Sequence, residues 1–140
     1  MFNFNTFFSF SQEIELVDIK KFIPDIVLDI RYSTEKNFTG RILYSSPDCF
    51  VAKEVALALK KVNDDLKKQG YRLKIFDGYR PLSVQKILWE KFPDPKFIAN
   101  PKKGSVHNKG YAVDVSLVDL NGKDVLMPTD YDEFTEKAYP

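Results

Sequence analysis

The chain has 140 residues, of which 44% are hydrophobic and 29% charged. This composition fits one globular domain and disfavours both disorder and a second full domain. The 21 Lys and Arg residues nearly balance the 20 Asp and Glu residues, and a net charge of +1 provides no basic excess for nucleic-acid binding. No apolar run approaches the ~20 residues that cross a bilayer. The single cysteine excludes an internal disulfide, and any histidine chemistry rests on His107, the one histidine.

The first twelve residues differ in composition from the rest of the chain. Residues 1–10 (MFNFNTFFSF) contain five Phe residues and no charged residue. They lack the positive start of a secretory signal, and polar residues interrupt the apolar run. We therefore expect residues 1–12 to be an N-terminal extension or the remnant of a signal, and residues 13–140 to form the domain. The cytoplasm and the periplasm both stay open as compartments.

The first half of the domain predicts short extended segments followed by a helix. Residues 14–19 and 23–30 are short runs rich in Ile and Val, as in strands, and residues 37–40 indicate a turn. Residues 51–68 predict a helix, with Pro47 and Asp48 near its start and Gly70 just past its end. One face of this helix is marked by apolar residues at spacings of three and four: Val51, Val55, Leu59, Val62 and Leu66.

The second half predicts a strand, a helix and a further strand. Residues 72–76 are expected as a strand, and residues 81–92 as a helix with Pro81 in its first turn. A loop over residues 93–104 precedes a strand over residues 111–120, and Asn121-Gly122 is a hairpin signal. Strands and helices are mixed without regular βαβ alternation. We therefore predict the α+β class, with a small antiparallel sheet flanked by helices.

The segment SVHNKGYAVD (residues 105–114) is the most informative for chemistry. Strand alternation predicts a core face formed by Tyr111, Val113, Val115 and Leu117. It places Asp114 on the opposite face, and the bend before the strand allows His107 to fold back towards that carboxylate. A histidine nitrogen and a carboxylate oxygen are zinc ligands, but a zinc site needs three or four. From spacing alone, a simple hydrogen-bonded His–Asp pair is the commoner arrangement.

Three other residues have both a functional and an ordinary interpretation. Arg80, in DGYRP (residues 77–81), lies where a strand enters a helix and is able to stabilise an oxyanion. Its position alone is more typical of a surface arginine. Tyr32 offers a pocket hydroxyl or is a tyrosine at the edge of the core. Asp132 lies near aromatic residues, and either binds an ammonium group or is a solvated charge. Cys49 is expected to be buried and not reactive.

Together these motifs resemble those of the zinc-dependent D-alanyl-D-alanine dipeptidases of the vancomycin-resistance type. That family belongs to the wider group of D,D- and L,D-peptidases that cut peptidoglycan peptides. The resemblance extends from about Val17 to Tyr139. It rests on four motifs in order: IRYSTEKNFTG, DGYRP, SVHNKGYAVD and MPTDYDEF. It implies an α+β fold of the D,D-peptidase and hedgehog type, and the hydrolysis of D-Ala-D-Ala with zinc as cofactor.

The resemblance also implies roles for individual residues. His107 and Asp114 match two of the three protein ligands of one zinc ion per chain. Arg80 matches the arginine that stabilises the tetrahedral oxyanion. Three residues match positions around the dipeptide and its free amino group: Tyr32, Ser105 and Asp132. In the family, a zinc-bound water attacks the peptide carbonyl.

One departure from the family pattern concerns the third ligand and the general base, which come from a Glu-x-x-His motif. This sequence has no such motif and no second histidine. We therefore expect a C-terminally truncated dipeptidase domain whose activity is impaired, because no positioned base remains. Two alternatives stay open. One is a non-catalytic module that binds D-Ala-D-Ala, and the other is a related D,D- or L,D-carboxypeptidase that acts on longer peptides. The expected partner is a small D,D-dipeptide, and the sequence does not set the oligomeric state.

Overall fold

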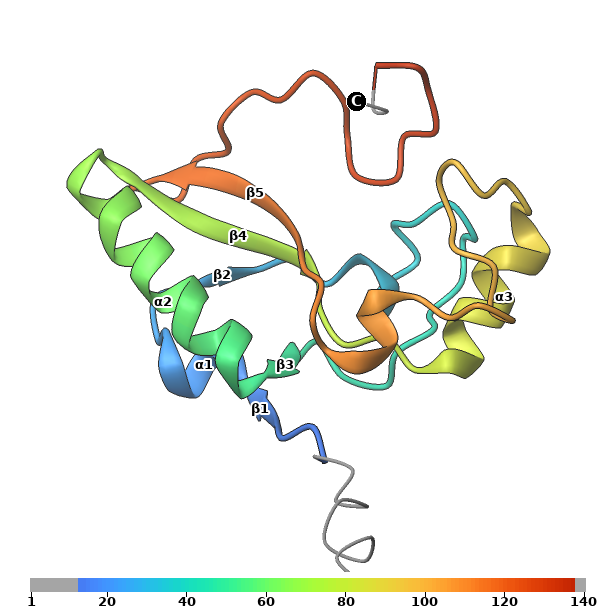
Figure 1. Cartoon of the computed structure of the whole chain (residues 1–140). Helices are drawn as coiled ribbons and strands as arrows, with labels where there is room; N and C mark the ends of the chain where they lie inside the picture. Colours follow the sequence, from blue (N-terminus) through green and yellow to red (C-terminus); the bar gives the residue numbers. More distant parts are fainter. Residues whose placement is uncertain (1–12, 138–140) are drawn as a thin grey trace, which may run out of the picture.

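Three α-helices, two short 3₁₀ helices (η2 and η3) and five strands make up the described part of the chain, residues 13–137 of the computed structural model. The expectation for residues 1–12 lies outside these described residues. The elements follow in this order: β1 (Leu16–Asp18), α1 (Ile19–Phe22), β2 (Val27–Leu28), η2 (Arg31–Ser33), β3 (Phe50–Ala52), α2 (Lys53–Lys68), β4 (Tyr71–Asp77), α3 (Leu82–Lys91), η3 (Val106–Lys109) and β5 (Asp114–Asp119). Figure 1 shows their arrangement.

The strands form a three-stranded sheet, in the order β2-β4-β5, and a separate two-stranded ribbon of β1 and β3. The α+β class is confirmed. The larger sheet is mixed and not purely antiparallel: β5 is antiparallel to β4, but β2 runs parallel to it, with Val27 opposite Lys74. A parallel pair needs a long crossover connection. Here the chain between β2 and β4 provides it, and this chain includes η2, β3 and α2.

The main core lies between the sheet and α2. Leu73 and Ile75 of β4 are buried there against Ile19, Val51 and Ala56. In Figure 1, α2 lies along one side of the sheet, and the segment that follows β5 arches over the other side. The sheet is therefore covered by a packed helix on one face and only by an irregular segment on the other.

The helix predicted from residue 51 begins two residues later, because residues 50–52 pair with β1 as β3, with Leu16 opposite Ala52. Its apolar face is also rotated: Val62 is 46% exposed, and its neighbour Asn63 is fully buried. Asn63 accepts a hydrogen bond from the backbone N–H of Leu73 at 2.8 Å, which ties the helix to β4. The end of the helix is as predicted. Gly70 adopts a φ of +89°, a conformation that glycine reaches without strain.

The predicted core face of the last strand is correct only in part. Val113 and Leu117 pack against the main core, but Tyr111 and Val115 are 44% and 46% exposed, so their prediction as core residues was wrong. The strand begins at Asp114, and β5 is the edge of its sheet. Val115 lies opposite Ile75 on this edge strand, but it stays exposed while Ile75 is buried. Tyr111 lies before the strand, and its hydroxyl donates to Glu54 at 2.8 Å.

A second cluster, mostly aromatic, holds the C-terminal segment against α3. Phe134 stacks on Phe92 with ring centroids 4.6 Å apart, and it packs edge-on against Phe38 at 4.8 Å. Behind these rings lie Val84 and Leu88, both buried on α3. The segment after β5 is therefore fixed at its far end. Within residues 13–137, no helix combines the length and the apolar character needed to cross a membrane.

Candidate active site

His107 is held by a short, fully capped turn. The Ser105 hydroxyl accepts a hydrogen bond from the backbone N–H of His107 at 3.3 Å, and the Asn108 side chain accepts one from the N–H of Ser105 at 2.7 Å. Such reciprocal capping satisfies donors that a helix start leaves free. Gly110 ends the turn with a φ of +77°, and a Cβ there would lie 2.9 Å from the backbone nitrogen of Ala52. The turn is thus packed tightly against β3.

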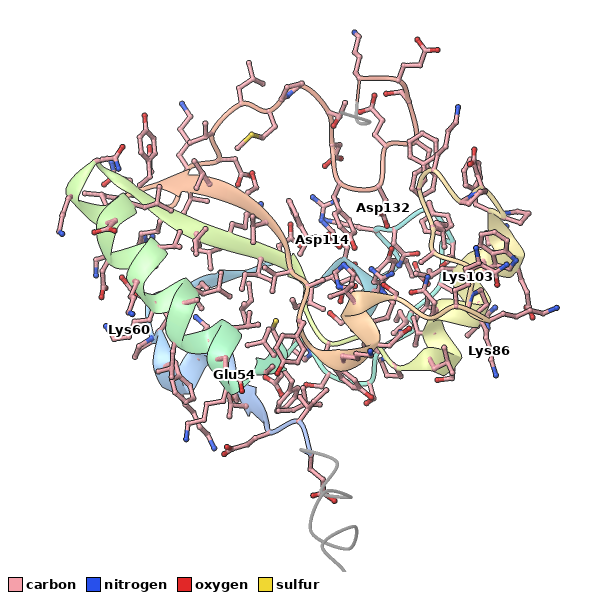
Figure 2. The ribbon with its side chains drawn as sticks, viewed as in Figure 1. Glu54, Lys60, Lys86, Lys103, Asp114 and Asp132 are labelled. Atoms are coloured by element: carbon pink, nitrogen blue, oxygen red, sulfur yellow. The ribbon has the colours of Figure 1, made fainter. Side chains whose placement is uncertain are left out.

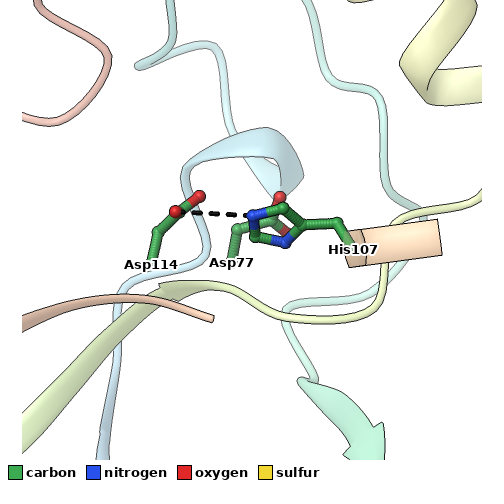
Figure 3. Close-up of side chains that lie close together, drawn as sticks. All are labelled: Asp77, His107 and Asp114. Atoms are coloured by element: carbon green, nitrogen blue, oxygen red, sulfur yellow. Dashed lines mark ion pairs between the residues drawn. The ribbon is translucent and has the colours of Figure 1, made fainter. Parts of the chain in front are cut away.

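The turn brings His107 to Asp114, as the sequence predicted. The Nε2 atom of His107 lies 3.5 Å from Oδ1 of Asp114 (Figure 3). The other ring nitrogen, Nδ1, lies 2.9 Å from the carbonyl oxygen of Gly78. Because a carbonyl oxygen only accepts, Nδ1 carries a proton, and the lone pair of the neutral ring is on Nε2. Histidines that bind metals are commonly oriented by a second hydrogen bond of this kind.

His107 and Asp114 each favour the charged form of the other. Burial lowers the pKa of His107, but Asp114 raises it, and the net pKa is above its usual value. Burial raises the pKa of Asp114, but His107 and Arg80 lower it, and the net pKa is below its usual value. A proton and a metal ion therefore compete for Nε2.

Asp77 completes a group of three side chains able to hold a metal ion: ligand atoms of Asp77, His107 and Asp114 all lie within 4.8 Å of one another. Asp77, however, is fully buried, and donors already occupy both of its oxygens. Oδ1 accepts from the Tyr44 hydroxyl at 2.7 Å and from the Gly78 N–H at 3.0 Å. Oδ2 accepts from Arg80 Nε at 2.9 Å and Nη2 at 2.7 Å. Burial raises the pKa of Asp77, while Arg80 and Tyr44 oppose that shift.

Arg80 is buried, with only 7% of its surface exposed, so the interpretation as a surface arginine is wrong. Besides its two bonds to Asp77, its Nη1 donates to Oε1 of Gln85 at 2.9 Å. Its Nη2 lies 3.6 Å from Oδ2 of Asp114, and its guanidinium lies 5.5 Å from the centroid of the Tyr32 ring. Burial lowers the pKa of Arg80, but Asp77 raises it, and the net pKa is above its usual value. Arg80 is therefore a fixed cation next to the His107–Asp114 pair.

The loops that carry Arg80 and His107 are joined through their backbones. The Arg80 N–H donates to the carbonyl of His107 at 2.9 Å, and the Asn108 amide donates to the carbonyl of Arg80 at 2.9 Å. With the bond between His107 and Gly78, three hydrogen bonds connect the two loops. The spacing between the cation and the imidazole is thereby set by one backbone–backbone hydrogen bond and two side chain–backbone hydrogen bonds.

Tyr32 and Asp132 meet on the side of the site nearest the C-terminal segment. The Tyr32 hydroxyl donates to Oδ2 of Asp132, and Tyr32 is only 1% exposed. Asp132 is not simply a solvated charge: it is partly buried, and burial raises its pKa to about 6. Next to it, the Tyr131 hydroxyl lies 3.3 Å from Oδ2 of Asp114, and its ring stacks on Phe76. Figure 2 shows Asp114 and Asp132 in the middle of the molecule, while Lys60 and Lys86 lie at its periphery.

Three residues of the cluster border an open cleft of about 1010 Å³: Asp114, Tyr131 and Asp132. One wall is the face of the sheet opposite α2, with Lys74, Phe76 and Asp114, and the other is the segment over residues 123–134. Ion pairs between Lys74 and Asp124 at 2.8 Å and between Arg31 and Asp130 at 3.5 Å hold this segment to the rest of the fold. The cleft reaches Asp114, while His107 lies behind that carboxylate and does not line it.

Five of the six predicted site residues lie together: Tyr32, Arg80, His107, Asp114 and Asp132. The sixth, Ser105, is near them, and its hydroxyl caps the turn that carries His107. Sequence reasoning missed four residues of the same cluster: Tyr44, Asp77, Gln85 and Tyr131. Asp77 precedes Arg80 by three residues, and this spacing could have indicated an ion pair between them. Tyr44 and Gln85 have no local pattern that identifies them.

An α+β fold with a partly buried imidazole, a carboxylate at an open cleft and a fixed arginine beside them suits a hydrolase that uses a metal ion. The comparison with known proteins makes this specific. A family model described as D-ala-D-ala dipeptidase, of the peptidase M15 group, matches residues 12–140, and the chain belongs to this family.

Three relatives illustrate the family. The D-alanyl-D-alanine dipeptidase of Escherichia coli (strain K12) is 33% identical over 129 residues, which cover 92% of this chain and 67% of that protein. The D-alanyl-D-alanine dipeptidase of Enterococcus faecalis (strain V583) is 29% identical, over 79% of this chain and 65% of that protein. A putative carboxypeptidase, YodJ of Bacillus subtilis (strain 168), is 30% identical over 97 residues, or 33% of its length. The chain thus spans about two thirds of the two dipeptidases.

Proposed function

We propose that this domain hydrolyses the dipeptide D-Ala-D-Ala with zinc as its cofactor. The observation that carries the proposal is the cluster of His107, Asp114 and Arg80. The His107 imidazole lies 3.5 Å from the Asp114 carboxylate, and the Arg80 guanidinium lies 3.6 Å from the same carboxylate. The names of the two dipeptidase relatives support the substrate.

The donor atoms fit zinc, which takes imidazole nitrogen and carboxylate oxygen. His107 would bind through Nε2, because Nδ1 is engaged with Gly78, and Asp114 would bind through a carboxylate oxygen. When bound, zinc polarises a carbonyl group and lowers the pKa of a water molecule. Among the described residues, Asp77 is the other candidate ligand of this group, but its oxygens already accept four hydrogen bonds. We therefore infer that the third ligand and the general base are other groups, as a Glu-x-x-His motif would provide.

The remaining residues would bind and orient the substrate. Arg80 holds a positive charge, shielded from water, where a tetrahedral oxyanion develops next to the ligand pair. Asp132, with Tyr32 donating to it, provides an anion for the free ammonium group of the dipeptide. Burial raises the pKa of Asp132 to about 6, although Arg80 opposes the shift, so the carboxylate is still mostly charged at pH 7.5 and able to pair with an ammonium group. The Ser105 hydroxyl already caps the His107 turn, and a contact between Ser105 and the dipeptide would use this same hydroxyl.

Zinc content is the first test of the proposal. We expect the 140-residue chain to take up zinc only weakly in equilibrium dialysis at pH 7.5, because two of its ligands are assigned, and His107→Ala and Asp114→Asn to take up less. Asp65→Asn is the matched control, because Asp65 is an exposed carboxylate paired with Lys68 on α2. Elemental analysis of each purified variant gives the metal-to-protein ratio. Equal zinc in the wild type and in both site variants would refute the assignment of the ligands.

Hydrolysis is the second test. The release of D-alanine from D-Ala-D-Ala in the presence of zinc is compared with that from L-Ala-L-Ala, which has the same composition and the opposite configuration. We expect selective turnover of the D,D-dipeptide at a low rate, since the general base is not among the described site residues. Calorimetry that shows dipeptide binding without turnover would favour the non-catalytic binding module instead.

A carboxypeptidase that acts on longer peptides is the second candidate function. The open cleft of about 1010 Å³ has room for more than two alanine residues, and one relative is named a putative carboxypeptidase. A pentapeptide that ends in D-Ala-D-Ala separates the two functions. A dipeptidase prefers the dipeptide because Asp132 needs its free ammonium group nearby, and preference for the pentapeptide would favour the carboxypeptidase.

A further inference from the structure

We propose that Gln85 is a positioning residue that fixes the direction in which the Arg80 guanidinium points. Its effect on catalysis rests on the proposed function, but its effect on Arg80 does not. Gln85 lies in the first turn of α3, away from the cleft, and it is fully buried. Its neighbours Val84 and Leu88 are apolar and buried as well.

The amide of Gln85 has only one orientation that satisfies both of its contacts. Its Nε2 lies 2.7 Å from the carbonyl oxygen of Ala99, and its Oε1 lies 2.9 Å from Nη1 of Arg80. The carbonyl of Ala99 only accepts and the guanidinium only donates. A flipped amide would therefore place oxygen against oxygen and nitrogen against nitrogen. The loop that contains Ala99 thus fixes Gln85, and Gln85 in turn fixes Arg80.

Gln85 and Asp77 hold different edges of the guanidinium. Asp77 accepts hydrogen bonds from Nε and Nη2 of Arg80. This two-point contact still allows the opposite side of the guanidinium, at Nη1, to tilt. Gln85 holds that far side at Nη1. Three of the five N–H donors of arginine are then engaged, and the free ones are confined to directions set by the fold. One of the free donors belongs to Nη2, which lies 3.6 Å from Asp114.

A buried glutamine is a costly way to fill an apolar helix face, because an amide removed from water needs partners for both of its ends. A leucine or methionine would fill similar space without that requirement. The position of Gln85 is therefore better explained by the arginine that it contacts than by the packing of α3. A donor aimed in advance at a developing oxyanion needs no reorganisation during the reaction.

Nitrogen-15 NMR of the Arg80 side chain tests the positioning directly and needs no enzymatic activity. We expect separate, slowly exchanging Nη1 and Nη2 signals in the wild-type chain. Gln85→Met has nearly the same volume but no acceptor, so its Nη1 and Nη2 signals should exchange measurably faster, although Asp77 still holds Nε and Nη2. Gln85→Glu keeps the acceptor oxygen and should keep the exchange slow. Gln69→Met, at the exposed end of α2, is the matched control. An exchange rate in Gln85→Met equal to that of the wild type would overturn the proposal.

Kinetics on the same variants test the consequence for catalysis. We expect Gln85→Met to lower kcat for D-Ala-D-Ala by about tenfold to a hundredfold, with KM changed less than threefold. Gln85→Glu should recover part of this loss. If kcat instead followed the folded fraction of each variant, Gln85 would be only structural and the proposal would be overturned. A wild-type chain without turnover would refute the proposed function, and the NMR signals would still decide the role of Gln85.

Discussion

Replacing Asp132 with asparagine tests whether the site holds a charge that destabilises the fold. Burial raises the pKa of Asp132 from 3.8 to about 6, and its hydrogen bond from Tyr32 opposes the shift. The folded chain therefore binds this proton more tightly than the unfolded chain does. The contribution of Asp132 to stability is then most favourable below pH 4, and it declines as the pH rises from 4 to 6.

The magnitude follows from the size of the shift. A change of two pKa units corresponds to about 3 kcal/mol, and the partial exposure of Asp132 reduces the effect to about 1 to 2 kcal/mol. Asparagine is always neutral, and its oxygen still accepts from Tyr32. We therefore expect Asp132→Asn to be more stable than the wild type by this amount at pH 7.5, and nearly equal to it at pH 4.

Urea unfolding at a series of pH values, with a chelator present, measures the difference between the two chains. Groups that do not interact with Asp132 contribute equally to both chains, and their contributions cancel. The repulsion between Asp114 and Asp132 is part of the measured effect, because it helps to raise the pKa of Asp132. The φ of +54° at Asp132 suits asparagine at least as well as aspartate, and any such offset is independent of pH. A difference that does not change between pH 4 and pH 7.5 would refute the reasoning.

Two further substitutions probe the loops that carry the site. Gly78→Ala would place a Cβ 2.6 Å from Sγ of Cys49, and we expect a loss of about 1 to 3 kcal/mol in unfolding free energy. Cys49→Ala should offset part of this loss, and strict additivity of the two changes in urea unfolding would contradict the contact. Ser105→Ala removes the cap of the His107 turn and should cost about 1 kcal/mol. It should also weaken zinc binding as measured by competition with a chromophoric chelator, and unchanged zinc affinity would argue against a role in orienting the imidazole.

Local sequence patterns predicted well those helices and strands whose bounds depend only on neighbouring residues. The helix over residues 82–91 and its buried Val84 and Leu88 follow from spacing and from Pro81. The start of α2 could not be predicted, because it depends on the pairing of residues 50–52 with β1. Pairing between segments more than thirty residues apart leaves no periodic signal within either of them.

The contacts of the candidate site also divide into those between neighbours in the sequence, which could be predicted, and those between distant residues, which could not. The contact of His107 with Asp114 could be predicted, since the two residues are separated by one bend and the geometry of a strand. The hydrogen bond between Tyr32 and Asp132 joins residues one hundred positions apart, and only the resemblance to a family related them. The buried Arg80 donates to Gln85, and in the sequence Gln85 cannot be told from any polar residue of an amphipathic helix.

The three hydrogen bonds that connect the loop of Gly78 and Arg80 to the turn of His107 have a consequence for how the domain would bind and release the proposed zinc ion. In small zinc domains, the ion organises the chain, and chelation unfolds the protein. Here the imidazole is already oriented by Gly78, and its turn is tied to the backbone of Arg80. Binding and release of zinc would therefore leave the loops in place. We expect apoprotein prepared with a chelator to remain folded and to bind zinc again without refolding.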